Sequence, residues 1–151
     1  MKHLKTHSSY ALLSALITTL IVMAEILFLH QEKGDILAEF SPSAKSYALL
    51  AVSYFGVFAL GYFLALACVL AAEKIVKKWI LSYAAGFAIY FAILGIFMYT
   101  TGRVGIFQAY EAGIWEFFKN FAAQANIVMT LQVFTISFAF IRIARKKHLS
   151  K

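Results

Sequence analysis

Long apolar stretches alternate with short polar segments along the whole chain. Each stretch has about the length that an α-helix needs to cross a hydrocarbon core about 30 Å thick, which is roughly 20 residues. The four stretches cover residues 10–29, 47–72, 79–100 and 122–141, and only the first contains an ionisable side chain, Glu25. This pattern predicts an all-α polytopic membrane protein, a bundle of four transmembrane helices in which residues 1–151 form a single membrane domain.

The segment that precedes the last stretch has a different pattern. Between residues 104 and 121, bulky apolar side chains recur at helical spacing, with polar residues between them: Phe107, Tyr110, Ile114, Phe118 and Phe121. An apolar stripe on an otherwise polar helix is typical of a helix that lies in the membrane interface. We therefore expect a short amphipathic helix over 104–121, which either covers the outer rim of the bundle or offers a docking surface to another protein.

Composition narrows the class of protein further. The 151 residues are 62% apolar and 14% charged, whereas soluble domains are about 45–50% apolar and about 25% charged. So few polar residues also exclude a disordered chain. Cys68 is the single cysteine, which excludes a disulfide scaffold within the chain.

The net charge of +7 is unevenly distributed. Most of the 14 basic residues precede the first stretch, lie between the second and third, or follow the fourth, whereas the acidic residues gather mainly in the other two connections. By the positive-inside rule, this distribution predicts that both termini are cytoplasmic. We interpret the charge as a signal of orientation in a bacterial inner membrane rather than as affinity for nucleic acid.

Small residues form stripes on the second and third predicted helices. Helix association in lipid depends on close backbone approach through such residues. The short connection between the two helices predicts a hairpin in which the stripes face each other. The first stripe comprises Gly61, Ala65, Cys68 and Ala72, and the second comprises Ser82, Ala85, Ala88, Ala92 and Gly95.

The opposite face of the third predicted helix is largely aromatic. It carries Tyr83, Phe87, Tyr90, Leu94 and Phe97. We expect these side chains to face lipid or fill the bundle, and stacking on a ligand or a partner helix is the alternative.

Polar side chains inside the predicted spans are the candidate site. Glu25 shares one face of its helix with Ser14 and Thr18, and an ionisable group within a span is costly and often functional. We expect that face to turn inward, with the carboxylate either binding an ion or proton or forming a hydrogen bond between helices. By depth, its expected partners are Gln124 and Asn126.

The fourth predicted helix is polar on two sides. One side carries Gln124, Gln132 and Thr135, and the other carries Asn126, Thr130 and Ser137. A helix polar on both sides is expected to be buried on both sides. This pattern favours a homo-oligomer or a heteromeric membrane partner.

No motif for catalysis, cofactor binding or metal binding emerges. The histidines are assigned to the tails and the rim of the bundle, outside the depth at which they could act inside the membrane. We therefore expect a non-enzymatic protein without a cofactor that acts through helix contacts. It would be an accessory subunit of a membrane complex or a protein like the colicin immunity proteins, whose architecture, though no motif, it shares. The alternative is a small oligomeric cation- or proton-coupled transporter or channel that uses Glu25.

Overall fold

The computed structural model describes residues 2–33, 44–101 and 126–149, which form four helices. These are α1 (Lys2–Lys33), α2 (Ala44–Ile75), α3 (Trp79–Thr101) and α6 (Asn126–Leu149). Each helix contains a segment long and apolar enough to cross a membrane: Lys5–Glu25, Tyr47–Ile75, Trp79–Phe97 and Ile127–Lys147. The predicted all-helical architecture with four such helices is therefore confirmed. The expected amphipathic helix over 104–121 lies outside the described residues.

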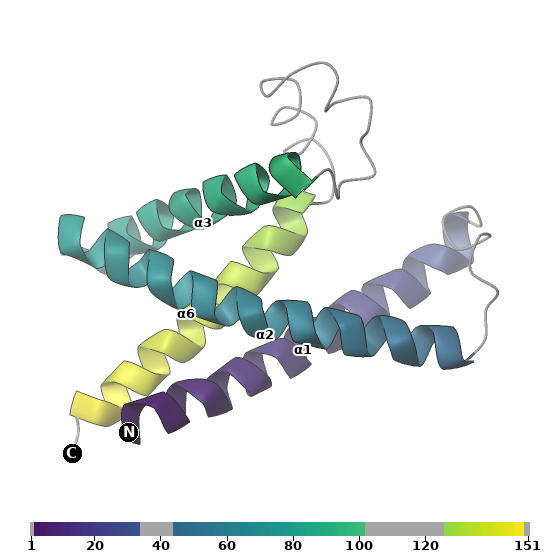
Figure 1. Cartoon of the computed structure of the whole chain (residues 1–151), viewed down its shortest axis with the longest axis horizontal. Helices are drawn as coiled ribbons and strands as arrows, with labels where there is room; N and C mark the ends of the chain where they lie inside the picture. The colour runs from purple at the N-terminus through teal and green to yellow at the C-terminus, as the bar shows by residue number, and fades with distance from the viewer. Residues whose placement is uncertain (1, 34–43, 102–125, 150–151) are drawn as a thin grey trace.

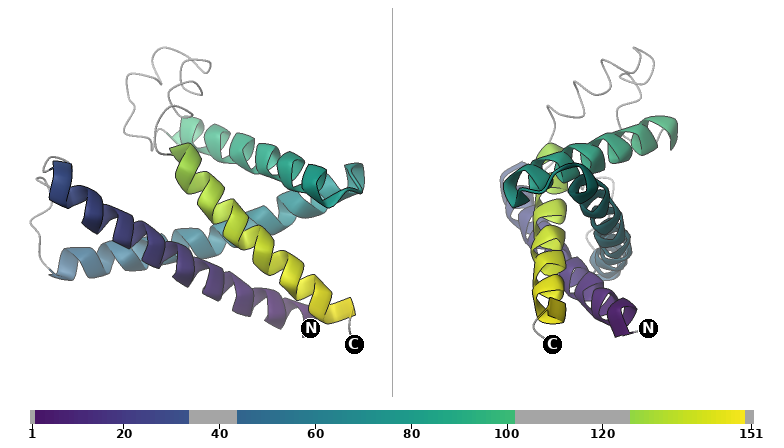
Figure 2. Two further views of the ribbon diagram at one scale, coloured as in Figure 1. Left: turned by 180° about the vertical axis from the view of Figure 1, so that it is seen from behind. Right: turned by 90° about the vertical axis from the view of Figure 1, so that its left-hand side faces the viewer.

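The helices pack around a central pair. Residues 76–78 link α2 and α3 in a tight hairpin, and both α2 and α6 contact all three other helices. The start of α1, the turn between α2 and α3, and the end of α6 lie on one side of the molecule, the left in Figure 1. Away from that side the bundle opens, because the end of α1 and the start of α2 diverge from the end of α3 and the start of α6 (Figures 1 and 2).

The core combines small side chains with one cluster of aromatic rings. Helix α1 contributes Ala11 and Ala15, both almost fully buried, so its backbone can approach its neighbours closely. Phe134 of α6 is completely buried. Its ring lies 5.4–6.1 Å, centroid to centroid, from the rings of four neighbours: Tyr83, Phe87, Tyr90 and Phe138. Such distances are typical of favourable aromatic pairs.

Helix α3 packs through a face that only partly coincides with the expected small stripe. The small stripe of α2 is inside the bundle, with Ala65, Cys68 and Ala72 buried, but Ala88 and Ala92 of α3 are exposed and Ala85 is only partly buried.

The buried residues of α3 are Ser82 and Gly95, at the two ends of the expected stripe, together with Gly86 and Tyr90. A Cβ atom on Gly86 would lie 3.2 Å from the Phe134 ring and 3.7 Å from the Val69 backbone, so this glycine permits the close approach of α3 to α2 and α6. The aromatic side chains next to it fill the bundle, except for the exposed Phe97. The aromatic side chains pack inward because small residues on both α2 and α3 would leave the interior of the bundle unfilled.

The outer surface of the bundle is apolar on all four helices. Large side chains that are more than half exposed include Leu20 on α1, Leu60 on α2, Ile80 on α3 and Val128 on α6. An aliphatic surface of this extent is unfavourable in water. It is the surface that a bundle surrounded by lipid requires.

Candidate functional site

Helix α6 joins the bundle through polar side chains directed at three different helices. Ser137 and Gln132 contact α1, Thr135 contacts α3, and Arg145 pairs with Glu73 of α2. Hydrogen bonds of this kind specify which helices are neighbours, because their groups have few other partners in an apolar medium. Helix α6 is thus the centre of the polar network.

Glu25 and Gln132 form the most distinctive contact in this network. The Gln132 Nε2 donates a hydrogen bond to the Glu25 Oε1 over 2.6 Å. Gln132 Oε1 is buried and has no partner among the described residues, whereas the Glu25 side chain as a whole is exposed. The site therefore combines a carboxylate that is accessible from outside with a carbonyl oxygen that has a free acceptor position.

The described partner of Glu25 is Gln132, and the expected contacts with Gln124 and Asn126 stay a prediction. Gln124 lies outside the described residues, and of Asn126 only the helical backbone is described. Gln132 is itself a member of the candidate set. The orientation of Glu25 differs from the expected one, because it is exposed at the surface rather than turned inward like Ser14 and Thr18.

Ser14 and Thr18 form a separate buried cluster. Ser14 Oγ lies 3.2 Å from Ser137 Oγ on α6, and Thr18 Oγ1 donates to the Ser14 carbonyl oxygen over 2.8 Å. Both side chains are almost completely buried. Their hydrogen bonds reach α6 and their own helix, and neither reaches Glu25. Ser14 and Thr18 therefore do not form one site with Glu25.

Only one of the two polar sides of α6 is buried within the chain. Thr130 and Ser137 are buried, whereas Thr135 is exposed and Gln132 partly exposed. Thr135 nevertheless lies 2.8 Å from the Tyr83 hydroxyl of α3, just as Gln132 reaches α1. Because both side chains find partners at the edges of α6, their polarity alone does not require a second subunit.

Several polar contacts of the bundle do not follow from the sequence patterns, among them those of His7 and Tyr83. His7 lies inside α1, not in a tail, and its Nδ1 is 3.1 Å from the hydroxyl of the buried Tyr62 on α2. Tyr83 was grouped with the apolar aromatic stripe, yet its hydroxyl contacts Thr135. The signal available in the sequence was the tyrosine itself, since a buried phenol normally has a hydrogen-bond partner.

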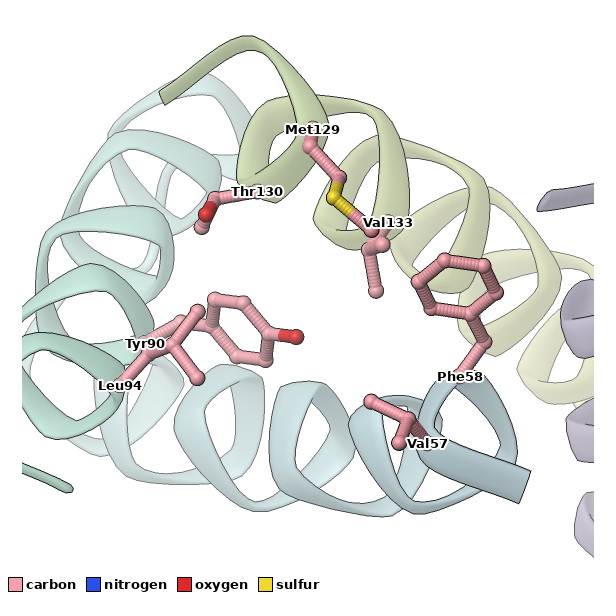
Figure 3. Close-up of a pocket in the computed structure, with 7 residues that line it drawn as sticks. All are labelled: Val57, Phe58, Tyr90, Leu94, Met129, Thr130 and Val133. Atoms are coloured by element: carbon pink, nitrogen blue, oxygen red, sulfur yellow. The ribbon is translucent and has the colours of Figure 1, made fainter. Parts of the chain in front are cut away.

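An apolar cavity of about 90 Å³ opens between α2, α3 and α6. Figure 3 shows the Tyr90 hydroxyl directed into the space between the helices, with side chains of α6 opposite. The lining comprises Val57, Phe58, Tyr90, Leu94, Met129, Thr130 and Val133. A cavity of this size and polarity can hold a short alkyl or aromatic group and offers little to an ion.

No set of three or more His, Cys, Asp or Glu side chains that could hold a metal ion occurs in residues 2–33, 44–101 and 126–149. Comparison with known proteins finds no match to this chain among family models, curated proteins or solved structures.

Proposed function

We propose that this chain is a small, non-enzymatic integral membrane protein that acts by binding another transmembrane helix, as an accessory subunit of a membrane complex or as an immunity-like protein. The observation that carries the proposal is the exposed position of Glu25, the last residue of the candidate span Lys5–Glu25, with the exposed apolar side chains of Leu27 and Phe28 just beyond it. A carboxylate is costly at the surface of a helix surrounded by lipid. A partner helix with a hydrogen-bond donor or a cationic side chain lowers this cost.

The surroundings of Glu25 are suited to such a partner. Ile21 and Phe28 lie one turn before and after it on the same face of α1, and both are exposed, Phe28 by 74%. A partner helix on this face would bury two apolar side chains and meet the carboxylate between them. Such a combination of apolar packing with one polar contact is typical of association between helices in membranes.

Photo-crosslinking in native membranes tests this proposal. A photoreactive residue at Phe28 is expected to give a discrete adduct, either with a second copy or with one other protein, identified by mass spectrometry. Leu60 is the matched control position, because it is equally exposed but lies on α2. The adduct should disappear in Glu25→Ala. No adduct at Phe28, or equal adducts at Phe28 and Leu60, would contradict the proposal.

For the orientation, we propose that both termini are cytoplasmic and that the membrane is a bacterial inner membrane. The distribution of basic residues supports it, because those with described side chains lie around the start of α1, the α2–α3 turn and the end of α6, on one side of the molecule (Figure 1). A green fluorescent protein fused to the C-terminus should fluoresce in bacterial cells, and a periplasmic alkaline phosphatase fused there should be inactive. The reverse result would contradict this orientation.

A second candidate function is a small oligomeric transporter or channel that couples to a cation or proton at Glu25. The observation in its favour is the buried Gln132 Oε1, which has no hydrogen-bond partner among the described residues and belongs to the same amide whose Nε2 donates to the carboxylate. Two oxygens from neighbouring helices can share a proton or ligate a small cation. In proteoliposomes, Glu25→Gln should abolish flux while preserving the helical bundle; absence of flux from the unaltered protein would exclude this function.

A further inference from the structure

Strongly basic segments, the α2–α3 turn and the C-terminal part of α6, lie on one side of the molecule (Figure 1). We call their exposed basic side chains the basic rim, which comprises Lys74, Lys77, Lys78, Arg142, Lys146 and Lys147. Two segments far apart in the sequence thus present cations on the same side of the molecule (Figure 1).

An ion pair joins α2 to α6 beside the basic rim. It involves Glu73, the only carboxylate near the basic rim among the described residues. Arg145 Nη1 contacts Glu73 Oε2, joining the end of α6 to the end of α2. The remaining carboxylates in the described helices, Glu25 and Glu32, belong to the second half of α1, away from this side. Because Glu73 is already paired with Arg145, the six cations of the basic rim have no counter-charge within the described part of the chain.

An aromatic side chain places the basic rim at the level of the headgroups. Trp79 directly follows Lys78 and is 58% exposed, and the next residue, Ile80, is 60% exposed. Tryptophan is enriched where apolar spans meet the headgroup layer. Apolar surface therefore begins immediately beside the lysines, as it does on a helix end that emerges from a bilayer.

We propose that the basic rim binds the headgroups of anionic phospholipids, with Lys77 and Lys78 beside Trp79 as its principal contacts. Flexible lysine side chains near the end of a span can extend into the headgroup layer. Each basic residue near an anionic leaflet then contributes attraction over about one Debye length. The proposal rests on the membrane insertion proposed above and adds a lipid class and its binding residues to it.

Quenching of Trp79 fluorescence by brominated lipids tests this proposal. The chain has two tryptophans, so a Trp115→Phe background leaves Trp79 as the only reporter. The protein is reconstituted into phosphatidylcholine vesicles that contain a small fraction of either brominated phosphatidylglycerol or brominated phosphatidylcholine. We expect the anionic lipid to quench at a lower mole fraction, with a preference that decreases by about fivefold for each lysine removed and decreases in high salt.

The decisive comparison is between the lysines of the α2–α3 turn and a lysine at the opposite end of α2. The variant Lys77→Gln/Lys78→Gln should lose the preference for the anionic lipid, whereas Lys45→Gln, at the start of α2 and away from the basic rim, should keep it. Equal quenching by both brominated lipids in the unaltered protein would overturn the proposal, as would equal losses in the two variants. Absence of quenching by either lipid would overturn membrane insertion itself, which distinguishes failure of the proposed function from failure of this site.

Discussion

Glu25 on α1 accepts a hydrogen bond of 2.6 Å from Gln132 on α6, although the glutamate is exposed and the glutamine is partly buried. The carboxylate is therefore held in place by the protein on one side while its other side faces outward. This arrangement gives Glu25 two roles that can be measured separately. One is a contribution to the stability of the bundle, and the other is the proposed recognition of a partner.

The contribution to stability is expected to be modest. Hydrogen bonds between helices in membranes average about 0.6 kcal/mol and reach about 1.7 kcal/mol, and a charged acceptor belongs near the upper end of that range. A double-mutant cycle of Glu25→Ala and Gln132→Ala, measured by unfolding in mixed micelles, should give a coupling energy of about 1 kcal/mol. Additive effects of the two substitutions would show that the contact does not form.

Two glycines of α2 should respond differently to alanine. A Cβ atom on Gly56 meets nothing within 4 Å, so Gly56→Ala should stabilise the helix by about 0.5–1 kcal/mol. On Gly61 the same atom would lie 3.1 Å from the Tyr90 hydroxyl and 3.2 Å from Val133 Cγ1. Gly61→Ala should therefore lose most of that gain, and Gly61→Leu should destabilise the bundle strongly. Equal stabilisation by both alanine substitutions would contradict the close packing of α2 against α3 and α6.

The sequence predicts the helices of this protein better than their pairing. Uninterrupted apolar stretches determine which segments are helical, because backbone groups in an apolar medium must be satisfied within the helix. Which face of α3 packs inward is not determined in this way, since α3 has both a small face and an aromatic face at helical spacing. The completely buried Phe134 of α6 decides the outcome, because its ring packs edge-to-face against Tyr83 and Phe87 of the aromatic face.

The contact between Glu25 and Gln132 is not one that matching depths along the chain predicts. Counting from the ends of the spans assumes that helices stand parallel, but α1 and α6 diverge toward one end (Figure 2). The contact at Glu25 and the contact at Ser14 lie more than twice as far apart along α1 as along α6. Gln132, deeper in its helix than the expected partners, therefore meets the carboxylate through two long side chains.

Removal of the Phe134 ring should be the most damaging single truncation in the core. Its side chain is completely buried among Tyr83, Phe87, Tyr90 and Phe138. Truncation of such a ring typically costs about 3–5 kcal/mol through lost contacts and the cavity that remains. Phe134→Ala should approach that loss, and Phe134→Leu should lose less. Leu131→Ala, at an exposed position one turn away, should change the free energy of unfolding by less than about 0.5 kcal/mol.

The Arg145–Glu73 pair should hold the ends of α2 and α6 together but contribute little to the free energy of unfolding. Both side chains are about 30% exposed, and ion pairs in contact with solvent typically contribute about 0–1 kcal/mol. Glu73→Gln and Arg145→Gln should each reduce the free energy of unfolding by less than about 1 kcal/mol. Glu73→Gln should in addition release one more cation to the basic rim and so strengthen its preference for anionic lipid. The charge-reversed pair Glu73→Arg/Arg145→Glu should restore the stability and return the lipid preference to that of the unaltered protein. If the reversed pair is less stable than either single variant, the two side chains do not form the contact that joins α2 to α6.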